Sequence, residues 1–311
     1  LGPTVSFVAV GDNLLDTTLS AYADACAGAV GDGAYDFTPL YSGVKPLVEG
    51  ADLAYVSQET HLGGDDLGVH GYPSFNTPDA LADAITATGF DLVALASNHC
   101  YDFGNYGALE HARTVWNEQP LAVAGIAASE AEAAEIPVVE REGITFAFLD
   151  YTYGLNGFDP EDVAPYAVNF ISEERLRADV PRARELADVV VVAMHWGTEK
   201  VTSPDEDQLA WAQLLADLGA DIVLGSHPHV IQPVEWVKGD AGTTLVAYGL
   251  GDFKSNHTTP HLESELAGML ACDFVRQTEG AEVTIANVRW IRRVNHAEEA
   301  ASNVYLLRDN T

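Results

Sequence analysis

Short apolar runs alternate along the chain with stretches whose apolar residues recur at helical spacing. The runs end at polar or glycine residues, which is typical of β-strands. Before Gly225 they are Thr4–Val10, Leu53–Val56, Leu92–Ala96, Ile136–Glu140, Thr145–Leu149, Val189–Met194 and Asp221–Leu224. Helices are predicted from Leu14, over Pro78–Thr88, Gly104–Glu118 and Ser172–Leu186, and from Ser203. Strands that alternate with helices in this way predict an α/β fold built from βα units.

Two of the predicted helices carry capping residues in the expected places. Thr77 is the predicted N-cap of the helix Pro78–Thr88, and Gly89 follows its last residue. Ser203-Pro204-Asp205-Glu206 reads as a capping box with proline at the first helical position, and Gly219 ends the helix that follows. These residues strengthen the prediction of alternating strands and helices.

The pattern changes in the last quarter of the chain. Thr244–Tyr248, Leu266–Val275 and Glu282–Ile291 predict strands with few helices between them, so we expect a more antiparallel second sheet there. The earlier run Val189–Met194 is entirely apolar, which is typical of a strand covered on both faces. The chain has no internal repeat and no linker rich in proline or serine. We therefore expect residues 1–311 to form a single domain.

Composition narrows the possible functions. The 311 residues are 47% hydrophobic, which is sufficient for a large buried core. They carry 15 Lys and Arg against 47 Asp and Glu, a net charge of −32. This charge disfavours nucleic acid and anionic membranes as partners. An anionic substrate would need a local cation, which a bound metal ion could supply.

The chain gives few signals about its cellular location. No apolar run reaches the roughly 18 residues of a membrane-spanning helix. Leu1-Gly-Pro-Thr resembles neither an initiator methionine nor a signal peptide, so we expect a trimmed chain. Cys26, Cys100 and Cys272 form no spaced pair and do not indicate a redox compartment. Cys100 is open to two interpretations, a reactive thiol or a small buried packing residue.

Polar side chains of the metal-binding kind follow the predicted strands. They are Asp12, Glu59, Asn98, His99, His195, His227 and His229. Because ligands of βα sheets gather outside the carboxyl ends of the strands, we expect these side chains to converge in one cleft. Carboxylate, imidazole and carboxamide groups suit Mn, Zn or Fe, and there are enough of them for one or two divalent ions. Two neighbouring ions can deprotonate a water and clamp a phosphoryl oxygen, which predicts hydrolysis of a phosphate ester.

Several of these residues also have a structural interpretation. Asp12 could cap the helix that follows it, and His195 could be a core histidine with a satisfied ring. The pair His227-Pro228-His229 is by itself only a hypothesis, although an extended backbone could aim both rings at neighbouring ions. The concentration of such residues at strand ends favours the metal site.

The segment Tyr151–Phe170 is aromatic, punctuated by Gly and Pro, and without a period. This pattern is typical of a long loop over a site. We expect the loop to wall the cleft and to select substrate, with Tyr151 and Tyr153 in contact with the substrate. Trp196 and Glu199 are the other candidate substrate-binding residues, and Trp196 is more typical of a wall than of a catalyst.

Short motifs follow one another in order between Val5 and Met269. They are Gly11-Asp12, the Glu59 segment, Asn98-His99-x-x-Asp102-x-Gly104, His195-Trp196-Gly197-x-Glu199, Gly225-x-His227-Pro228-His229-Val230-x-Gln232 and Tyr248-Gly-Leu-Gly-Asp-Phe253. In this order they resemble CapA-type capsule (poly-γ-glutamate) synthesis proteins, a family similar to the calcineurin-like metallophosphatases. The resemblance implies a four-layer αββα metallophosphatase-like sandwich.

The resemblance also carries expectations about cellular context. It implies an extracytoplasmic bacterial protein that is membrane-tethered in its full-length form, with the tether absent from this chain. The implied role is in capsule or poly-γ-glutamate assembly. The implied partners are a cell-envelope polymer or its precursor and membrane-bound capsule synthesis subunits.

Residue by residue, the resemblance assigns roles to the strand-end groups. The implied metal ligands, with Glu59 bridging two ions, are Asp12, Glu59, Asn98, His195, His227 and His229. His99 would be the general acid to the leaving group, and Asp102 would orient its ring. Since Asn98 directs its side chain to the ion, the adjacent His99 must point elsewhere from an extended backbone.

The chain departs from the family pattern at three positions. Leu14 stands where metallophosphatases have a histidine, so one ion would lack a ligand. Ser57 and Asp252 stand where the family usually has Asn, which is expected to alter hydrogen bonds around the ligands. Two hypotheses follow. The first is a metal-dependent hydrolase of the phosphoesterase type that acts in cell-envelope polymer biosynthesis, and the second is a non-catalytic scaffold of capsule export that retains the fold.

Overall fold

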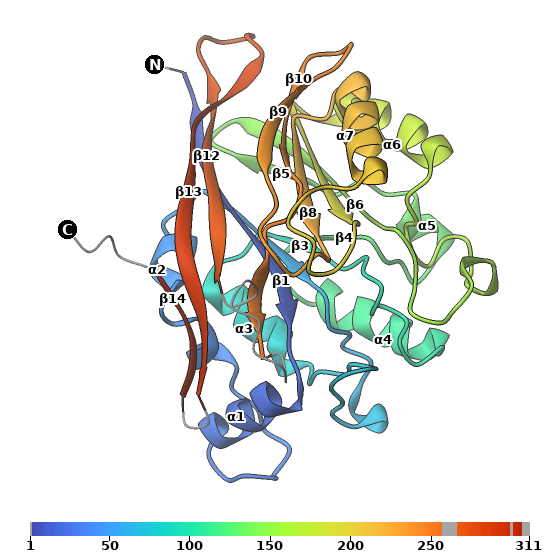
Figure 1. Cartoon of the computed structure of the whole chain (residues 1–311), viewed down its shortest axis with the longest axis vertical. Helices are drawn as coiled ribbons and strands as arrows, with labels where there is room; N and C mark the ends of the chain where they lie inside the picture. Colours follow the sequence, from blue (N-terminus) through green and yellow to red (C-terminus); the bar gives the residue numbers. More distant parts are fainter. Residues whose placement is uncertain (1, 257–265, 299–300, 307–311) are drawn as a thin grey trace.

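The computed structural model describes residues 2–256, 266–298 and 301–306, and these residues form two sheets packed face to face (Figure 1). In the described residues the first sheet has eight strands in the order β14-β13-β12-β1-β2-β3-β4, and β11 also pairs with β1. These strands are β1 (Thr4–Leu14), β2 (Leu53–Gln58), β3 (Leu92–Ala94), β4 (Ala122–Ala124), β11 (Asp252–Ser255), β12 (Leu266–Arg276), β13 (Val283–Glu298) and β14 (Ala301–Leu306). β1 to β4 and β11 are parallel, whereas β12 to β14 are antiparallel to their neighbours.

The second sheet, again within the described ranges, has six strands in the order β5-β6-β7-β8-β10-β9. They are β5 (Val138–Arg141), β6 (Ile144–Thr152), β7 (Val189–His195), β8 (Ile222–Ser226), β9 (Val234–Lys238) and β10 (Thr243–Ala247). The four central strands are parallel, and the edge strands β5 and β9 are antiparallel. β7 is buried at every residue, as its apolar sequence predicts for a strand covered on both faces.

Helices cover the outer faces of both sheets. The elements α1 (Thr17–Ala27), η1 (Thr38–Tyr41), α2 (Lys45–Val48), α3 (Ala80–Thr88) and α4 (Tyr106–Asn117) pack on the first sheet. The helices α6 (Glu173–Leu186) and α7 (Glu206–Leu218) pack on the second. The remaining short elements are η2 (Asp65–Leu67), α5 (Glu130–Ala133) and η3 (Pro160–Asp162). A third apolar cluster fills the space between the sheets, so the predicted four-layer αββα sandwich is confirmed. None of the helices in the described ranges has the length and apolar character to cross a membrane.

The C-terminal strands differ from the prediction of a separate antiparallel sheet. β10 joins the second sheet in parallel to β8, and β12 pairs antiparallel with β1 of the first sheet. β12 can lie inside the first sheet because it carries apolar residues on both of its faces. Leu270 contributes to the core between the sheets and Met269 to the core beneath the helices.

Three predicted helix starts are wrong by a few residues. β1 continues through Leu14, because β11 pairs with its last residues, and Asp16 is the N-cap of α1. Asp12 therefore lies inside the strand and caps no helix. The residue before α3 is Asp79, and its side chain forms no capping hydrogen bond. The N-cap of α7 is Asp205 and not Ser203, and Asp205 forms the capping box with the third residue of the helix.

The carboxyl ends of the parallel strands in both sheets lie at the same end of the sandwich. In the first sheet Asp12 pairs with Ser57 of β2. In the second sheet His195 of β7 lies between Thr152 of β6 and Ser226 of β8. The loops that leave these ends can therefore bring side chains from both sheets together.

Asp150 of β6 links the second sheet to the first sheet near the carboxyl ends of the strands. Its side chain is buried, and Oδ2 accepts hydrogen bonds from the backbone N–H groups of Leu95 and Ala96, each at 2.7 Å. These two residues follow β3 directly. A Cβ on Gly125 would lie 2.1 Å from the same oxygen, so the contact also requires glycine there. Asp150 thereby positions the segment that leads into Asn98.

We expect Asp150→Ala to lower the free energy of unfolding by about 2–5 kcal/mol, because two buried amide donors would lose their acceptor. Urea unfolding followed by circular dichroism measures the change. Asp150→Asn, which keeps an oxygen acceptor at this position, is the matched variant and should cost less. A loss below about 0.5 kcal/mol for the alanine variant, the usual range of surface substitutions, would contradict this role.

Candidate metal centre

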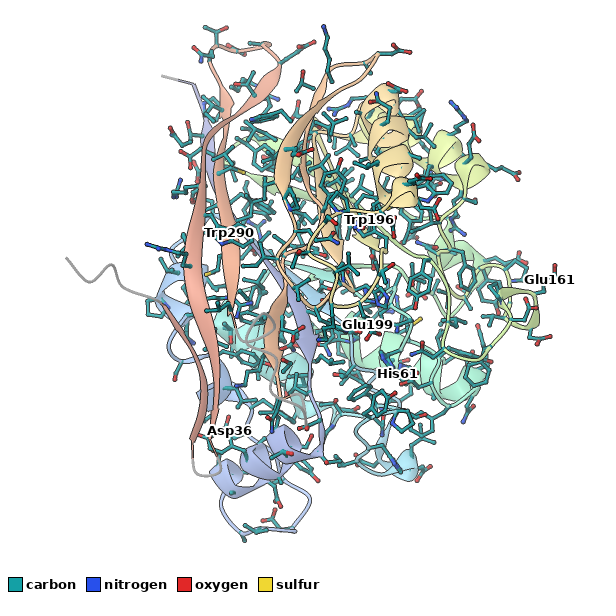
Figure 2. The ribbon with its side chains drawn as sticks, in the orientation of Figure 1. Asp36, His61, Glu161, Trp196, Glu199 and Trp290 are labelled. Atoms are coloured by element: carbon teal, nitrogen blue, oxygen red, sulfur yellow. The ribbon has the colours of Figure 1, made fainter. Side chains whose placement is uncertain are left out.

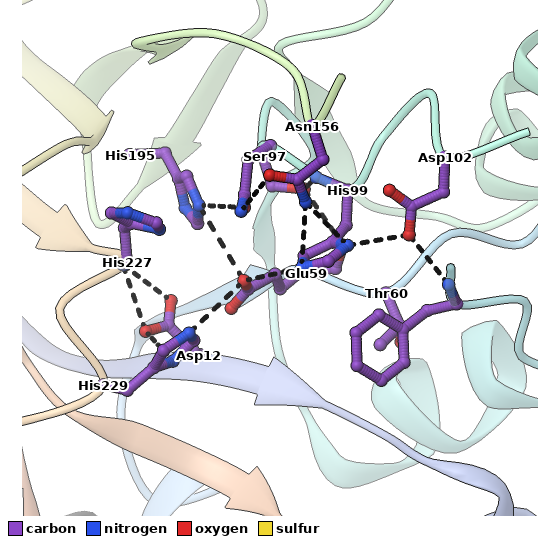
Figure 3. Close-up of polar contacts among 12 residues, drawn as sticks. Asp12, Glu59, Thr60, Ser97, His99, Asp102, Asn156, His195, His227 and His229 are labelled. Carbon is purple, nitrogen blue, oxygen red and sulfur yellow. Dashed lines mark hydrogen bonds and ion pairs between the residues drawn. The ribbon is translucent and has the colours of Figure 1, made fainter. Parts of the chain in front are cut away.

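Glu59 lies at the centre of a polar cluster between the sheets (Figure 3). It is 1% exposed, and Oε1 lies 3.7 Å from His229 Nε2, 3.9 Å from His195 Nε2 and 4.0 Å from His99 Nε2. Neither carboxylate oxygen has a hydrogen-bond partner among the residues that the structure describes. Burial of such a group is costly unless a cation or a hydrogen bond compensates it. The surroundings of Glu59 therefore fit a bound cation.

A first group of donors lies on the side of the second sheet. Glu59, His195 and His227 offer ligand atoms that all lie within 4.8 Å of one another. Asn98 adds Oδ1, 2.8 Å from His195 Nε2, and His227 Nδ1 is buried without a hydrogen-bond partner in the described part of the chain. Ser226 Oγ lies 2.9 Å from His195 Nδ1. Because a hydroxyl can donate or accept, Ser226 can hold the ring in the tautomer that an ion requires.

A second group lies on the side of the first sheet. Asp12, Glu59 and His229 offer ligand atoms within the same 4.8 Å limit. His229 Nδ1 lies 2.9 Å from Asp252 Oδ1 and 3.3 Å from Asp12 Oδ2, so its Nε2 faces Glu59. The backbone N–H of His227 donates to Asp12 Oδ2 at 3.1 Å. These contacts fix both the Asp12 carboxylate and the His229 ring.

The two histidines of the His-Pro-His segment lie on a turn, and the expectation of an extended backbone there is wrong. His227 has φ of 91° and His229 has φ of 56°, both in the left-handed region. Strain of this kind is concentrated at functional sites, where the surrounding structure maintains it. Gly225 allows the close approach, because a Cβ there would lie 1.9 Å from the carbonyl oxygen of Tyr248. The turn separates the two rings so that each joins a different group.

Burial changes the protonation of the cluster. It raises the pKa of the Glu59 and Asp12 carboxyls above their usual values, lowers the pKa of His195 well below its usual value and lowers the pKa of His227 to about 3. Burial alone would also lower the pKa of His229, but the surrounding carboxylates outweigh it and raise that pKa well above its usual value. Neutral His195 and His227 are in the form that ligates metals. A divalent cation would favour the ionised carboxylates that burial opposes.

The donor set therefore fits one or two divalent ions. The predicted ligands that the structure brings together in one cluster are Asp12, Glu59, Asn98, His195, His227 and His229. Glu59 belongs to both groups, in the bridging position that the family resemblance implies. Oxygen and imidazole nitrogen donors without sulfur suit Mn, Zn or Fe.

His99 lies at the edge of the cluster, where Asp102 holds its ring. Nδ1 lies 2.7 Å from Asp102 Oδ2, which also accepts the backbone N–H of Phe75 at 2.7 Å. The ring edge contacts Phe75, and Asn156 Nδ2 lies 3.2 Å from His99 Nδ1. With Nδ1 held by a carboxylate, Nε2 points toward Glu59. This orientation suits a group that delivers a proton into the centre.

The four residues predicted to bind substrate lie in two different settings. Tyr153 stacks on His195 with ring centroids 6.3 Å apart and contacts His227 at 4.7 Å, while exposed Glu199 joins His227 and His229 in a further donor group. Tyr151 and Trp196, in contrast, are buried in the core beneath α6 and α7.

The polar atoms of these two buried residues are committed to other partners. Tyr151 donates its hydroxyl to Asp179, and Trp196 donates Nε1–H to the carbonyl of Tyr248. Burial leaves neither side chain a surface to offer a substrate. We therefore correct the prediction by keeping only Tyr153 and Glu199 as proposed substrate contacts.

Sequence reasoning missed several residues that position the site. Asn156 reaches it from the loop after β6 and contacts both Asn98 and His99. Ser226 orients the ring of His195. Asp252, which was expected to affect the hydrogen bonds around the ligands, orients the ring of His229. Asp252 was noticeable as a departure from the family pattern, whereas an asparagine inside an aperiodic loop gives no signal. Of the loop predicted to wall the cleft, Tyr153 and Asn156 contact residues of the cluster.

Comparison with known proteins supports the family resemblance that the sequence motifs indicate. The family model described as bacterial capsule synthesis protein PGA_cap matches residues 6–257. The PGA biosynthesis protein CapA of Bacillus subtilis is 32% identical over 166 residues, which cover 53% of this chain and 42% of that protein. The capsule biosynthesis protein CapA of Bacillus anthracis is 29% identical over 175 residues, covering 55% and 41%. The matched region thus spans less than half the length of either relative.

Solved structures with a similar fold include two 5'-nucleotidases. A putative 5'-nucleotidase from Staphylococcus aureus has a TM-score of 0.53 at 15% identity, over 94% of this chain and 55% of that one. The 5'-nucleotidase precursor from Thermus thermophilus has a TM-score of 0.51 at 15% identity, over 96% and 56%. At this identity the likeness shows the fold alone, which is that of the metallophosphatases.

Proposed function

Because the chain belongs to the bacterial capsule synthesis protein PGA_cap family, we propose that it is a divalent-metal-dependent hydrolase of the phosphoesterase type in capsule or poly-γ-glutamate biosynthesis. The observation that carries the proposal is the buried carboxylate of Glu59, which lacks hydrogen bonds within the described residues and lies between two groups of metal-binding side chains. A scaffold protein gains nothing from such a costly group unless an ion binds to it.

Two sets of residues would hold the ions. Glu59, Asn98, His195 and His227 would hold the first, and Asp12, Glu59 and His229 the second. When bound, Mn, Zn or Fe ions would polarise a phosphoryl oxygen and lower the pKa of a coordinated water.

The protein's own groups would supply the remaining chemistry. His99, with Nδ1 held by Asp102, would donate the Nε2 proton to the oxygen of the leaving group. Asn156 contacts the His99 ring and would keep it in place. Tyr153 covers His195 and His227 on the exposed side and would limit the access of water and the shape of the substrate.

Partners and location follow from the family and remain proposals. We propose a cell-envelope polymer or its precursor as substrate and membrane-bound capsule synthesis subunits as partners, in an extracytoplasmic setting with a tether on the full-length protein. We also propose that residues 1–311 form one domain. The apolar cluster between the sheets, to which strands from both halves of the chain contribute, supports this proposal.

One observation favours the alternative, a non-catalytic component of capsule export. Leu14, where metallophosphatases have histidine, leaves the second group with only Asp12, Glu59 and His229. If that ion never binds, the chain would keep the fold without turnover.

Metal analysis after purification without chelator, combined with a hydrolysis screen of phosphate mono- and diesters with and without added Mn²⁺, tests the proposed function. We expect bound metal and hydrolysis that Mn²⁺ stimulates. A protein that carries metal but hydrolyses no ester would support the scaffold, and a protein that binds no metal would refute both the metal centre and the proposed activity.

The two ions should differ in affinity, because the first group has four buried protein ligands and the second has three. We expect about one tightly held ion per chain after purification and a second only at higher metal concentration. His227→Ala should remove the tight ion, whereas His229→Ala should retain it and abolish the Mn²⁺ stimulation. Atomic absorption and an activity titration with Mn²⁺ measure both effects. Equal metal losses in the two variants would show that this ligand assignment is wrong.

A further inference from the structure

A third donor group lies on the exposed side of the cluster. Glu199, His227 and His229 offer ligand atoms within 4.8 Å of one another. His227 also belongs to the first metal group and His229 to the second, so the Glu199 carboxylate lies where the two proposed shells meet. Glu59 is buried, whereas Glu199 is exposed. Figure 2 shows Glu199 near the middle of the molecule, below Trp196 in that view.

Glu199 is exposed but its backbone is held in place. The loop that carries it is tied to the histidine turn by the bond from Trp196 N–H to the Ser226 carbonyl at 3.2 Å and by that from Lys200 N–H to the Pro228 carbonyl at 2.8 Å. Gln232 Nε2 donates to the carbonyl of Val201 at 2.9 Å. These bonds hold the backbone on both sides of Glu199 against the histidine turn.

A neighbouring atom in this group lacks a partner. His227 is 4% exposed, and its Nδ1 has no hydrogen-bond partner within the described residues although it is buried. A buried imidazole nitrogen of this kind is satisfied by a cation at least as well as by a hydrogen bond. The unpartnered nitrogen and the nearby carboxylate are two separate observations that fit a cation on this side of the cluster.

We propose that Glu199 is a metal ligand on the exposed side of the centre, and that with His229 it contributes to the binding of the second ion. This inference rests on the proposed metal centre. The Glu199 carboxylate lies within 4.8 Å of a ligand atom of His229, which belongs to the group that lacks a histidine at position 14. Because Glu199 is exposed, it would be a ligand that a substrate oxygen could replace at small cost.

Calorimetric titration of the metal-free protein with Mn²⁺, without substrate, tests the proposal. Glu199→Gln should weaken binding of the second ion roughly 10- to 100-fold and leave the first ion unchanged, since a carboxamide is a poorer ligand than a carboxylate. The matched control is Glu140→Gln, which removes the same charge from an exposed glutamate on β5 beside the start of β6, at the opposite end of the sandwich. Thermal unfolding of the metal-free variants checks that both are folded.

The outcomes separate this inference from the proposed function. If Glu199→Gln binds both ions with wild-type affinity, Glu199 is not a ligand; a raised KM in that variant would then assign it to substrate. Equal weakening in Glu140→Gln would show an effect of net charge alone and would also overturn the proposal. If the wild-type protein binds no Mn²⁺, the proposed function fails first, and the ligand role of Glu199 fails with it.

Discussion

Glu59→Gln should remove both ions at Mn²⁺ concentrations that saturate the wild-type protein, because a carboxamide offers one neutral oxygen and cannot bridge two cations. The metal-free variant should be at least as stable as the wild type, since the substitution removes a buried carboxylate that has no hydrogen bond in the described structure. At a Mn²⁺ concentration of about 100 times the Kd of the tight site, binding of that ion alone should stabilise the wild type by about 2.7 kcal/mol. The variant should gain almost none. Thermal unfolding with and without Mn²⁺ measures both quantities.

Glu140→Gln again serves as the control, and it should keep the wild-type response to Mn²⁺. A Glu59→Gln protein with undiminished Mn²⁺ stabilisation would show that Glu59 does not bind the ions. A marked loss of stability in the metal-free variant would show that the carboxylate has a structural role in the absence of metal.

His99→Ala should lower turnover by roughly 10²–10⁴ and leave the metal content unchanged, because the ring supplies a proton and binds no ion in the proposed mechanism. The loss should shrink for an ester of 4-nitrophenol, since so acidic a leaving group departs without protonation. Asp102→Asn should lower turnover less, as it removes the charge that holds Nδ1 but keeps the imidazole. Steady-state kinetics on an alkyl and an aryl phosphate ester, with metal analysis of each variant, gives these values.

The double variant His99→Ala with Asp102→Asn tests whether the two residues act together. It should be no slower than His99→Ala alone, because residues that act as a unit are not additive. Loss of metal in His99→Ala would mean that His99 is a ligand. An equal loss of turnover on the alkyl and aryl esters would argue against proton donation.

The sequence predicted most of the sandwich because strand periodicity and strand-end chemistry are local signals. Val189–Met194 reads as a buried strand and His195 as its polar end, and the structure has both in those positions. Asp12 lies near the carboxyl end of β1 and Glu59 directly follows β2, and these two strands lie side by side in one sheet. Parallel strands must deliver their carboxyl ends to one edge, so the convergence of the candidate ligands required no long-range information.

What the sequence did not predict depends on tertiary contacts. Tyr151 and Trp196 lie next to site residues in the chain, yet each points into the core beneath the helices, because successive side chains of a strand face opposite sides. The pairing of β11 with β1, which extends β1 to Leu14 and brings Asp252 to His229, joins segments far apart in sequence. The left-handed turn at His227 and His229 has only a weak local signal, because histidine adopts positive φ more often than most residues but still uncommonly.

The proposed function requires a pair of neighbouring ions bridged by Glu59, and the electron paramagnetic resonance spectrum of the Mn²⁺-loaded protein would reveal such a pair. The metal-free protein is titrated with one and then two equivalents of Mn²⁺, at protein concentrations above the Kd of the weaker site. At one equivalent we expect the signal of an isolated ion. At two equivalents we expect the spectrum of a spin-coupled pair, since ions in two-metal sites lie about 3.5–4 Å apart. A spectrum at two equivalents that is the simple sum of two isolated ions would contradict the claim.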